Sequence, residues 1–345
     1  MLVSDAKAFK DERFADSVVE WQSIAEPVQP FLRDVASLLE RQVEAFDPEI
    51  AAYTRYALGN QGKQLRPVLV ALSAEAAGNV TRDHVAVAVI IEMVHLATLV
   101  HDDIMDEATL RRKRATLAAN WGNEISVLVG DCLFAHALTL AASFPTPLIC
   151  RAVASATNTV CGGEILQTHR RLNFEMTREE YFKVISMKTA ELFALSTELA
   201  ALLAGSGTEE RRALREYGRA LGTAYQIFDD CVDVFGTEKS AGKSLGTDLA
   251  SGKMTLPVLV VLEKATDEER EKLKELISGW RPHYFDRVLE LMRQYDALRD
   301  SQRVIWDLLR QAEGHLQRIP AGRGRQALTD LTSFLGRQTL ELRAG

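Results

Sequence analysis

The sequence predicts an all-α fold, a single large helical bundle spanning residues 1–345. Three observations support this expectation. Only nine prolines occur among the 345 residues, no series of short alternating strands is visible, and nearly every helical segment is apolar on most of its faces, as in AELFALSTELAALLA (190–204). Helices of this kind must be buried against one another. No stretch has the composition of an interdomain linker, so we expect one domain.

Composition and charge exclude several classes of protein. Hydrophobic residues make up 47% of the chain, which is ample for a large core. The formal net charge of −7 excludes a general polyanion binder. The four cysteines form no CxxC pair, which favours a reducing compartment. The polar start, MLVSDAKAFKDERFADS, lacks the apolar run of a signal peptide, so we expect a cytoplasmic protein.

Helix boundaries follow from apolar periodicity and from start and stop signals. The most apolar stretch, 85–100, is interrupted by Glu92 and His95, which predicts a buried helix rather than a membrane span. Thr177–Glu180 and Thr266–Glu269 have the spacing of capping boxes. The expected helices are 27–47, 62–77, 82–108, 120–143, 147–171, 178–204, 208–235 and 254–264, followed by a shorter set to the C-terminus.

The stretch LVHDDIMDEATLRRKR (99–114) continues directly from the apolar helix. On a helix, Asp102 and Asp106 lie on one face, about 5–6 Å apart at Cβ. Two like charges at that spacing repel each other, and the repulsion is stronger in a cleft than in water. A divalent cation would offset it, and carboxylates together with water are ligands that suit Mg²⁺.

The same aspartate pattern returns 127 positions later in YQIFDDCVDVFG (225–236), again at the end of an apolar helix. Asp229, Asp230 and Asp233 form this second DDxxD motif. A single motif would be weak evidence, since solvated acidic helix ends are common. Two motifs on two apolar helices would place two pairs of carboxylates across one cavity.

A diphosphate site also needs cations, and basic residues recur near both motifs. Arginine forks and lysine point charges are what phosphate oxygens bind. Lys188 stands out because its helical neighbours are apolar, and a buried lysine requires an anion. The other candidates are Lys63 and Arg66 in GNQGKQLRP, Arg111 and Arg112 after the first motif, Thr189 beside Lys188, Lys243 in AGKSLGTDL, and Lys253 in SGKMTLP.

Taken together and in order, these elements resemble the trans-prenyl diphosphate synthases, also called polyprenyl synthetases. The resemblance covers about residues 40–265 and rests on GKQLRP, HLATLVHDDIMDEATLRR, GDCLFAHAL, GGEILQ, KTAELF, YQIFDDCVD and GKSLGTDLASGKMTLP. It implies long helices around a deep central cavity, usually in a homodimer. It also implies Mg²⁺-dependent head-to-tail condensation of isopentenyl diphosphate with an allylic prenyl diphosphate.

The resemblance assigns roles residue by residue. Asp102 and Asp106 would hold two Mg²⁺ ions, and Asp229, together with Asp233, would hold a third. Asp102, Asp106, Asp229, Lys188 and Arg111 would form the catalytic set. The allylic diphosphate would be bound by Arg111, Lys188, Thr189, Gln226, Lys243 and Lys253, and isopentenyl diphosphate by Lys63, Arg66, His95 and Arg112.

The chain departs from the family pattern in two places. Gln61 and Gln64 stand where the family usually has a glycine and an arginine, and Lys113 and Ala115 replace a glycine and a proline after the double arginine. Lys63 and Arg66 are retained, so we expect altered affinity rather than lost function.

Product length is predicted from the helix that ends at the first motif. Ala97 and Thr98 lie about one turn deeper than Asp102, and Val94 and Ile91 lie further along. In the family, a bulky aromatic residue at the first of these turns stops growth at about fifteen carbons. Small residues here, and the similarity of HLATLVHDD and GNEISVLVGD to long-chain synthases that make quinone side chains, favour thirty carbons or more. A twenty-carbon, geranylgeranyl product is the alternative.

Three other classes compete with chain elongation. A terpene cyclase or head-to-head synthase would keep only part of the basic set, whereas Lys63, Arg66 and both motifs are present. A non-catalytic partner subunit would lack aspartates, and none is lost here. A purely structural bundle would not bind diphosphates with Mg²⁺.

A chain-elongating enzyme would need peripheral contact with a membrane to release its apolar product.

Overall fold

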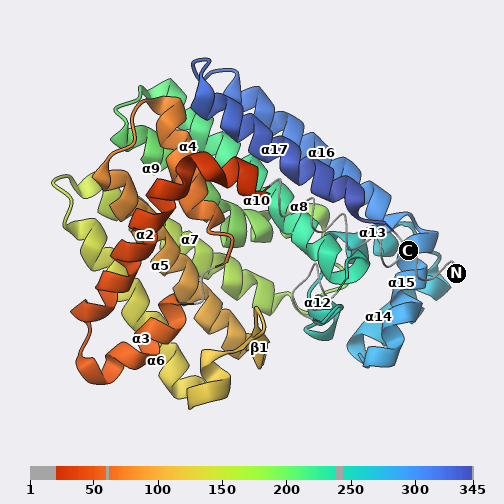
Figure 1. Ribbon diagram of the computed structural model, residues 1–345. Helices are drawn as coiled ribbons and strands as arrows, with labels where there is room; N and C mark the ends of the chain where they lie inside the picture. Colours follow the sequence, from red (N-terminus) through yellow and green to blue (C-terminus); the bar gives the residue numbers. More distant parts are fainter. Residues whose placement is uncertain (1–20, 60–61, 238–243, 344–345) are drawn as a thin grey trace, which may run out of the picture.

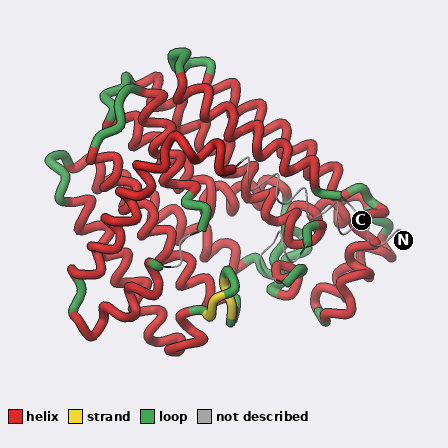
Figure 2. Tube along the Cα trace, viewed as in Figure 1, coloured by secondary structure: helices red, strands yellow, loops and turns green. Residues whose placement is uncertain are grey.

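The computed structural model describes residues 21–59, 62–237 and 244–343 of the chain. Helices dominate it, as the sequence predicts, and they pack into one bundle (Figures 1 and 2). The sole strands in the described ranges form a short antiparallel hairpin in which β1 (Leu110–Arg111) pairs with β2 (Arg114–Ala115). This hairpin follows the first aspartate motif directly.

The first half of the chain carries the helices that surround that motif. Asp47 caps one of them, and Pro48 occupies its first position, where a missing N–H costs nothing. In chain order the helices are η1 (Glu26–Val28), α2 (Gln29–Gln42), η2 (Val43–Ala45), α3 (Pro48–Leu58), α4 (Leu65–Ala77), α5 (Arg82–Met105), α6 (Leu117–Ala142) and α7 (Pro147–His169).

The second half carries the other aspartate motif and ends in a long helical hairpin. Figure 1 shows α16 and α17 side by side along one edge of the bundle. The helices are α8 (Arg178–Ile185), η3 (Ser186–Ala190), α9 (Glu191–Leu203), α10 (Thr208–Phe235), α12 (Thr247–Ala250), α13 (Leu256–Lys264), α14 (Asp267–Ser278), η4 (Pro282–Tyr284), α15 (Phe285–Gln294), α16 (Ala297–Leu316) and α17 (Arg323–Glu341).

The predicted boundaries hold best where caps and glycines mark them. The helix predicted over 208–235 has these bounds in the structure, and the Thr177–Glu180 capping box forms as predicted. Thr266 also caps its helix, but Glu269 bonds the threonine hydroxyl rather than the threonine N–H. The expectation of shorter helices toward the C-terminus is wrong for α16 and α17, which have 20 and 19 residues.

Three predicted helices are altered by local backbone breaks. The helix expected over 82–108 ends at Met105, because Glu107 takes a left-handed conformation with φ of 50° and the hairpin follows. In α6, Gly122 has non-helical angles and kinks the helix. The helix expected over 178–204 contains η3, a π-turn that holds Lys188 and Thr189. Insertions of this kind are frequent at functional sites.

The core is a continuous cluster that runs along α5 and α10, the two helices that end in the aspartate motifs. Helix α5 packs against α4, α6 and α9, and α10 lies between α9 and α16. Gly218 permits the close approach of α10 to α9, since a Cβ there would lie 2.5 Å from Thr197 Oγ1. This packing holds the two motif-bearing helices in fixed positions on either side of α9 and η3.

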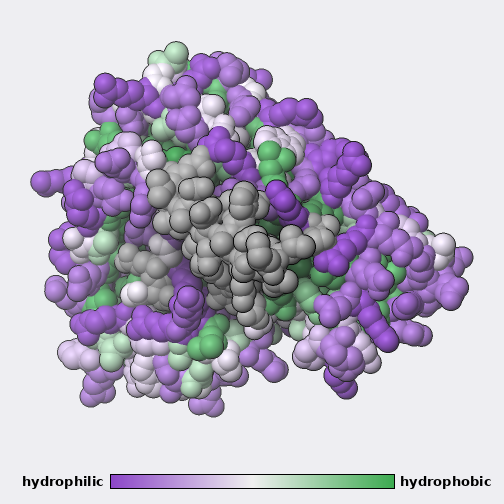
Figure 3. Space-filling model, turned by 45° about the vertical axis from the view of Figure 1, so that its right-hand side comes forward, coloured by the Kyte–Doolittle hydropathy of each residue, from purple (hydrophilic) through white to green (hydrophobic). Residues whose placement is uncertain are grey.

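Two helices of the described part, α5 and α6, are long and apolar enough to cross a membrane by length and composition alone. The apolar window of α5 is 78% buried in the molecule, which confirms the predicted core helix, but that of α6 is only 33% buried. On the face drawn in Figure 3 the surface is mostly hydrophilic, with hydrophobic residues in separate patches. Because most of its apolar window is exposed, the outer side of α6 is unusually apolar for a helix at the surface.

Candidate active site

The first aspartate motif lies at the C-terminal end of α5, where the backbone turns out of the helix. Asp106 is the residue at which the helix stops, and Asp102 lies one turn earlier. The Asp106 carboxylate contacts two cations, with Oδ1 2.9 Å from Arg171 Nη2 and Oδ2 2.8 Å from Lys253 Nζ. Asp102 Oδ2 lies 3.5 Å from Lys188 Nζ, and its Oδ1 is buried without a hydrogen-bond partner.

The hairpin after α5 turns the double arginine back toward the motif. Arg111 Nε donates a 2.6 Å hydrogen bond to Asp103 Oδ1, the middle aspartate of the motif. Burial raises the pKa of Asp103, and the guanidinium of Arg111 opposes that rise. In this structure Arg111 therefore holds the α5 terminus through Asp103, next to the two aspartates predicted as ligands.

The π-turn η3 presents Lys188 and Thr189 to the site. Lys188 Nζ donates to Glu164 Oε2 at 2.7 Å and to Gln167 Oε1 at 3.0 Å, both on α7. Burial lowers the pKa of Lys188, but the carboxylates of Asp102 and Glu164 outweigh it, so the net shift is upward. Lys188 is largely buried and lies against two carboxylates, Asp102 and Glu164.

The second motif lies at the end of α10 and divides its three aspartates among different environments. Asp229 is exposed, whereas Asp230 and Asp233 are buried. Asp230 accepts hydrogen bonds from the Tyr181 hydroxyl at 2.6 Å and from Gln226 Nε2 at 2.8 Å. Burial and the charge of nearby Asp248 raise the pKa of Asp230 to about 8.

Asp233, which we predicted as a metal ligand, faces α12. Its Oδ1 accepts from Thr247 Oγ1 at 2.7 Å and its Oδ2 accepts from the Asp248 N–H at 3.0 Å. Asp248 in turn places Oδ1 3.3 Å from Lys253 Nζ. Lys253 therefore links Asp106 of the first motif to Asp248 on α12, which Asp233 of the second motif holds in place. Lys243, predicted for the same diphosphate, lies outside the described residues, as does Gln61.

Two consecutive residues show that both motifs face one space. Lys188 reaches Asp102 of the first motif. Thr189 Oγ1 donates a 2.6 Å hydrogen bond to Gln226 Oε1, three residues before the second motif. The sequence-predicted allylic set, apart from Lys243, is therefore gathered between α5, η3 and α10. This arrangement of carboxylates and cations suits a diphosphate that bridges metal ions.

The residues predicted for isopentenyl diphosphate form a neighbouring basic cluster. Burial, and then the positive charges of Arg66 and Arg112, hold the pKa of His95 well below its usual value. The Arg112 guanidinium packs directly on Gly62, where a Cβ would come within 2.4 Å of it. Burial lowers the pKa of Lys63, and the negative charge of Asp229 in the second motif opposes that shift.

Arg66 is held from two sides in this cluster. Its guanidinium lies over the Phe193 ring, 5.2 Å from the centroid, and its Nε is buried without a hydrogen-bond partner. Glu92, one turn from His95, supplies a buried counter-charge, although burial raises its pKa. A partly buried cation with a buried and unused donor favours an anionic ligand.

The predicted chain-length residues line the same helix below the first motif. Ala97, Val94 and Ile91 are fully buried or nearly so, and Thr98 is partly buried. The Thr98 hydroxyl donates to the His95 carbonyl oxygen at 2.6 Å, so it points back along the helix. No bulky ring stands at any of these four positions.

The donors fit a hard divalent ion, although no group of three or more His, Cys, Asp or Glu side chains in the described ranges is preassembled as a metal site. Asp102 contributes a buried oxygen without a partner. The Asp106 carboxylate is paired with two cationic side chains, which shows that this position favours positive charge. Oxygen ligands of this type, completed by water and phosphate, match Mg²⁺.

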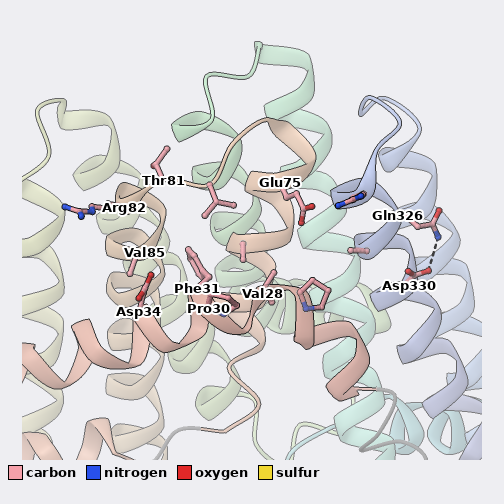
Figure 4. A pocket seen from close by; sticks show the side chains of 15 residues that line it. Val28, Pro30, Phe31, Asp34, Glu75, Thr81, Arg82, Val85, Gln326 and Asp330 are labelled. Carbon is pink, nitrogen blue, oxygen red and sulfur yellow. Dashed lines mark hydrogen bonds between the residues drawn. The ribbon is translucent and has the colours of Figure 1, made fainter.

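A surface groove of about 1030 Å³ lies elsewhere, at the opposite end of α5. Figure 4 shows Val28, Pro30 and Phe31 of η1 and α2 beneath it, with Thr81 and Val85 on one side and Gln326 on the other. None of the predicted site residues lines this groove. The candidate active site is therefore the charged region between α5 and α10, not this groove.

Three residues of the site were not singled out from the sequence. Glu164 and Gln167 belong to GGEILQ. Two polar residues three positions apart on an apolar helix could have indicated that they face a polar site. Arg171 lies in the polar loop RRLNFEMTREE, where nothing distinguishes it from a solvated arginine. Its position on Asp106 follows from tertiary contacts alone.

Comparisons with known proteins agree with this geometry. The polyprenyl synthetase family model matches residues 47–294. The octaprenyl diphosphate synthase of Escherichia coli is 36% identical over 277 residues, 80% of this chain and 86% of that protein. A short chain isoprenyl diphosphate synthase of Methanothermobacter thermautotrophicus is 34% identical over 278 residues, 79% and 86% of the two chains.

A solved structure shares the whole architecture. The polyprenyl synthase of Caulobacter crescentus, in complex with calcium and isoprenyl diphosphate, superposes with a TM-score of 0.87 at 31% identity, covering 92% of this chain and 98% of that one. The all-helical fold, the paired motifs and the family match all agree. This chain belongs to the polyprenyl synthetase family and is a prenyltransferase, a trans-prenyl diphosphate synthase.

Proposed function

We propose that this enzyme is a long-chain synthase that elongates an allylic prenyl diphosphate with isopentenyl diphosphate to an all-trans product of thirty carbons or more. One observation carries the site assignment. Lys188 and Thr189, adjacent in η3, contact Asp102 and Gln226 on the two motif helices, so a single diphosphate between them meets both motifs. The basic cluster of Lys63, Arg66, His95 and Arg112 adjoins this space and supplies the second diphosphate site.

The chemistry that follows from this arrangement is ionisation, attack and proton loss. Asp102, Asp106 and Asp229, the last together with Asp233, would hold Mg²⁺, which we propose as three ions, and the bound metal would neutralise charge on the allylic diphosphate. Lys188 and Lys253 hold the departing diphosphate, and the low dielectric of the buried site strengthens their attraction for it. The allylic C–O bond breaks, and the apolar walls of α5 keep water from the carbocation.

The second substrate then attacks from the basic cluster. Arg66, Arg112 and Lys63 orient isopentenyl diphosphate so that its double bond faces the allylic carbon. A C–C bond forms, and one proton leaves the resulting cation. No side chain described around the site stands out as the base, which is consistent with proton loss to the departing diphosphate. The elongated chain keeps its own diphosphate and re-enters the allylic site.

The long-chain proposal rests on the α5 residues rather than on overall identity. The Escherichia coli octaprenyl synthase and the Methanothermobacter short-chain synthase are almost equally similar to this chain, so identity does not separate the two outcomes. Ala97 and Thr98 present small side chains one turn below Asp102. Neither side chain carries a ring that would block a chain growing along α5.

Product analysis tests this proposal directly. The purified chain is incubated with Mg²⁺, isopentenyl diphosphate and farnesyl diphosphate, and the products are separated by reversed-phase chromatography after dephosphorylation. We expect products of thirty carbons or more. A sole twenty-carbon product would overturn the long-chain assignment while leaving the synthase intact. Absence of any elongation under these conditions would overturn the assignment of the site itself.

We also propose that the enzyme is a homodimer that buries the outer side of α6 and α7. Leu128 on α6 is 60% exposed and Ile165 on α7 is 69% exposed, and the apolar window of α6 is mostly uncovered. Large exposed apolar surfaces of this kind mark interfaces. Light scattering should give twice the mass of the chain for the wild type and one chain mass for Leu128→Glu. Leu340→Glu, an equally exposed leucine on α17, serves as control and should stay dimeric.

A further inference from the structure

The loop after α7 is locked to the loop before α13. Leu172 has a left-handed backbone with φ of 56°, and its N–H donates a 2.8 Å hydrogen bond to the Gly252 carbonyl oxygen. The Leu172 side chain packs on Gly252, where a Cβ would lie 2.9 Å from it. The residues next to this contact, Arg171 on one loop and Lys253 on the other, are thereby placed side by side.

Arg171 and Lys253 share one carboxylate, that of Asp106. Arg171 Nη2 lies 2.9 Å from Oδ1, and Lys253 Nζ lies 2.8 Å from Oδ2. The guanidinium also approaches the Met105 carbonyl oxygen, 3.4 Å from each of its Nη atoms. Its Nε is buried without a hydrogen-bond partner. The arginine is thus bound to Asp106 but does not use all its donors.

A divalent ion at Asp106 competes with these two cations for the carboxylate oxygens. Lys253 has a second acceptor at hand, because Asp248 Oδ1 lies 3.3 Å from its Nζ. Arg171 has no second carboxylate among its hydrogen bonds or ion pairs in the described structure, and only the Met105 carbonyl at long distance. Displacement would leave a partly buried guanidinium at the site mouth, and its planar fork matches two phosphate oxygens.

We propose that Arg171 exchanges partners during binding: it neutralises Asp106 in the metal-free enzyme and binds the diphosphate of the allylic substrate when metal enters. This inference rests on the proposed function, since the anion it names is that substrate's diphosphate. Arg171 would then act as a cation of the allylic site in addition to Lys188 and Lys253. It would also oppose metal binding until a diphosphate arrives, so that metal and substrate bind together.

A purely structural role for Arg171 predicts a different result. If the guanidinium only supports the end of α5 through Asp106 and Met105, its removal loosens the first motif and weakens metal binding. If it competes with the ion, its removal frees the Asp106 carboxylate and strengthens metal binding. The two roles therefore predict opposite signs for one measurement made without substrate.

The test compares Arg171→Gln with Arg170→Gln in the full chain. Arg170 is the adjacent arginine, and its Nη2 is bonded to Glu180 at 3.0 Å, so Arg170→Gln removes the same charge outside the site. Mn²⁺ binding is titrated by electron paramagnetic resonance without diphosphate. Inorganic pyrophosphate binding is titrated by calorimetry at saturating Mg²⁺. Farnesyl diphosphate turnover of the wild type is measured separately.

For Arg171→Gln we expect Mn²⁺ affinity to rise roughly two- to fivefold and pyrophosphate affinity to fall about tenfold to a hundredfold, the ranges that correspond to an ion pair near the surface and to a charged hydrogen bond. Arg170→Gln should change neither affinity. Arg171→Lys keeps the charge without the fork, so its pyrophosphate affinity should fall below that of the wild type, but by less than in Arg171→Gln. If the glutamine variant folds poorly, the comparison of Arg171→Lys with the wild type still tests the loss of the fork.

Weaker or unchanged Mn²⁺ binding in Arg171→Gln would overturn the exchange, as would unchanged pyrophosphate affinity. These readouts do not depend on turnover. If the wild type binds Mn²⁺ and pyrophosphate but elongates no prenyl chain, the proposed function fails while the role of Arg171 at a metal–diphosphate site is still decided.

Discussion

The Tyr181 hydroxyl donates a 2.6 Å hydrogen bond to Asp230 Oδ2, so the middle aspartate of the second motif is tied to α8. Asp230 Oδ1 accepts from Gln226, and Gln226 accepts from Thr189. A buried relay therefore connects α8 to the diphosphate-facing threonine. Asp230 therefore supports the site by holding Gln226 in position through this hydrogen bond.

Removing this hydroxyl should damage both stability and turnover. In Tyr181→Phe, a buried carboxyl loses its donor, and we expect the free energy of unfolding to fall by about 1–3 kcal/mol. Because Gln226 and Thr189 lose their fixed positions, kcat should also fall. Urea denaturation and steady-state kinetics measure the two effects.

Tyr217→Phe is the matched control. Its hydroxyl is equally buried and donates to the Leu328 carbonyl oxygen at 2.9 Å, between α10 and α17. We expect a similar loss of stability with little change in kcat. Equal kcat in the two variants would refute the relay.

Glu164 should set the position of Lys188. Its Oε2 accepts a 2.7 Å hydrogen bond from the lysine, and burial, with the charge of Asp102 adding to it, raises the pKa of Glu164 to about 7. In Glu164→Gln the lysine loses a charged hydrogen bond, which typically contributes about 1.5–3 kcal/mol. We expect kcat/KM for the allylic diphosphate to fall roughly tenfold to a hundredfold, with little change in KM for isopentenyl diphosphate.

Kinetics with each substrate varied in turn will check this split. Glu263→Gln is the control, since Glu263 pairs with Arg178 at 2.6 Å on the outer side of α8 and α13. It should leave both kinetic parameters unchanged. A fall in Glu164→Gln that affects both substrates alike would point to general damage instead.

Arg66 should be required for the second substrate as a fork and not merely as a charge. Arg66→Lys keeps a counter-charge for buried Glu92, so folding should be preserved. Lysine cannot bind two phosphate oxygens in the arginine geometry, and it also loses stacking on Phe193. We expect KM for isopentenyl diphosphate to rise about tenfold or more, while KM for the allylic substrate stays within about twofold. A rise in the allylic KM instead would exchange the two assigned diphosphate sites.

Sequence patterns predicted α10 and the paired motifs because their signals are local. Apolar periodicity and the flanking glycines, Gly207 and Gly236, are read from neighbouring positions. The helix α3 was missed even though Asp47 and Pro48 form a start signal. The π-turn in η3 was not predictable in this way, because it depends on α7 lying against it: a Cβ on Gly163 would come within 2.6 Å of the Lys188 backbone nitrogen.

The parts of the site that escaped prediction depend on contacts between distant segments. Arg171 meets Asp106 across 65 positions, and Lys253 meets it across 147. Contacts between residues so far apart along the chain produce no repeating pattern in the sequence. Lys253 was nevertheless predicted, since it belongs to a family motif, whereas Arg171 lies in a loop without one.

Acid stability should depend on Glu269, far from the active site. Its carboxylate accepts from the Tyr295 hydroxyl, from Thr266 Oγ1 at 2.7 Å and from Gln294 Nε2 at 2.7 Å. These donors, Tyr295 foremost, lower the pKa of Glu269 to about 2. Because the folded-state pKa lies below the unfolded value, the stabilisation is complete above about pH 4.5 and is lost as pH falls toward 2.

Tyr295→Phe should therefore lower the urea midpoint at pH 7, and the difference from wild type should shrink at pH 3. Equilibrium denaturation at both pH values measures it. Turnover should be unchanged, because α14 and α15 lie at an edge of the molecule and are separated from β1 (Figure 1). A deficit that is constant between pH 3 and 7 would show that the tyrosine acts through packing and not through the carboxylate.

Product length should respond to one position on α5. Thr98 is partly buried one turn below Asp102, and an aromatic ring there would stand in the path of the growing chain. We expect Thr98→Phe to shorten the product to about fifteen to twenty carbons while the first condensation continues. Ala97 is fully buried, so a ring at that position would also strain the core by about 1–3 kcal/mol, and Thr98 is the cleaner choice.

Thr98→Val separates the ring from the lost hydroxyl. The hydroxyl donates to the His95 carbonyl oxygen at 2.6 Å, and valine removes that bond with almost no change in volume. Valine should therefore leave the product distribution as in the wild type, whereas phenylalanine shifts it. If both variants shorten the product equally, the Thr98–His95 bond controls α5 and the ring does not. If neither does, the chain grows along a path that α5 does not line, and the floor of the cavity must be sought on another helix.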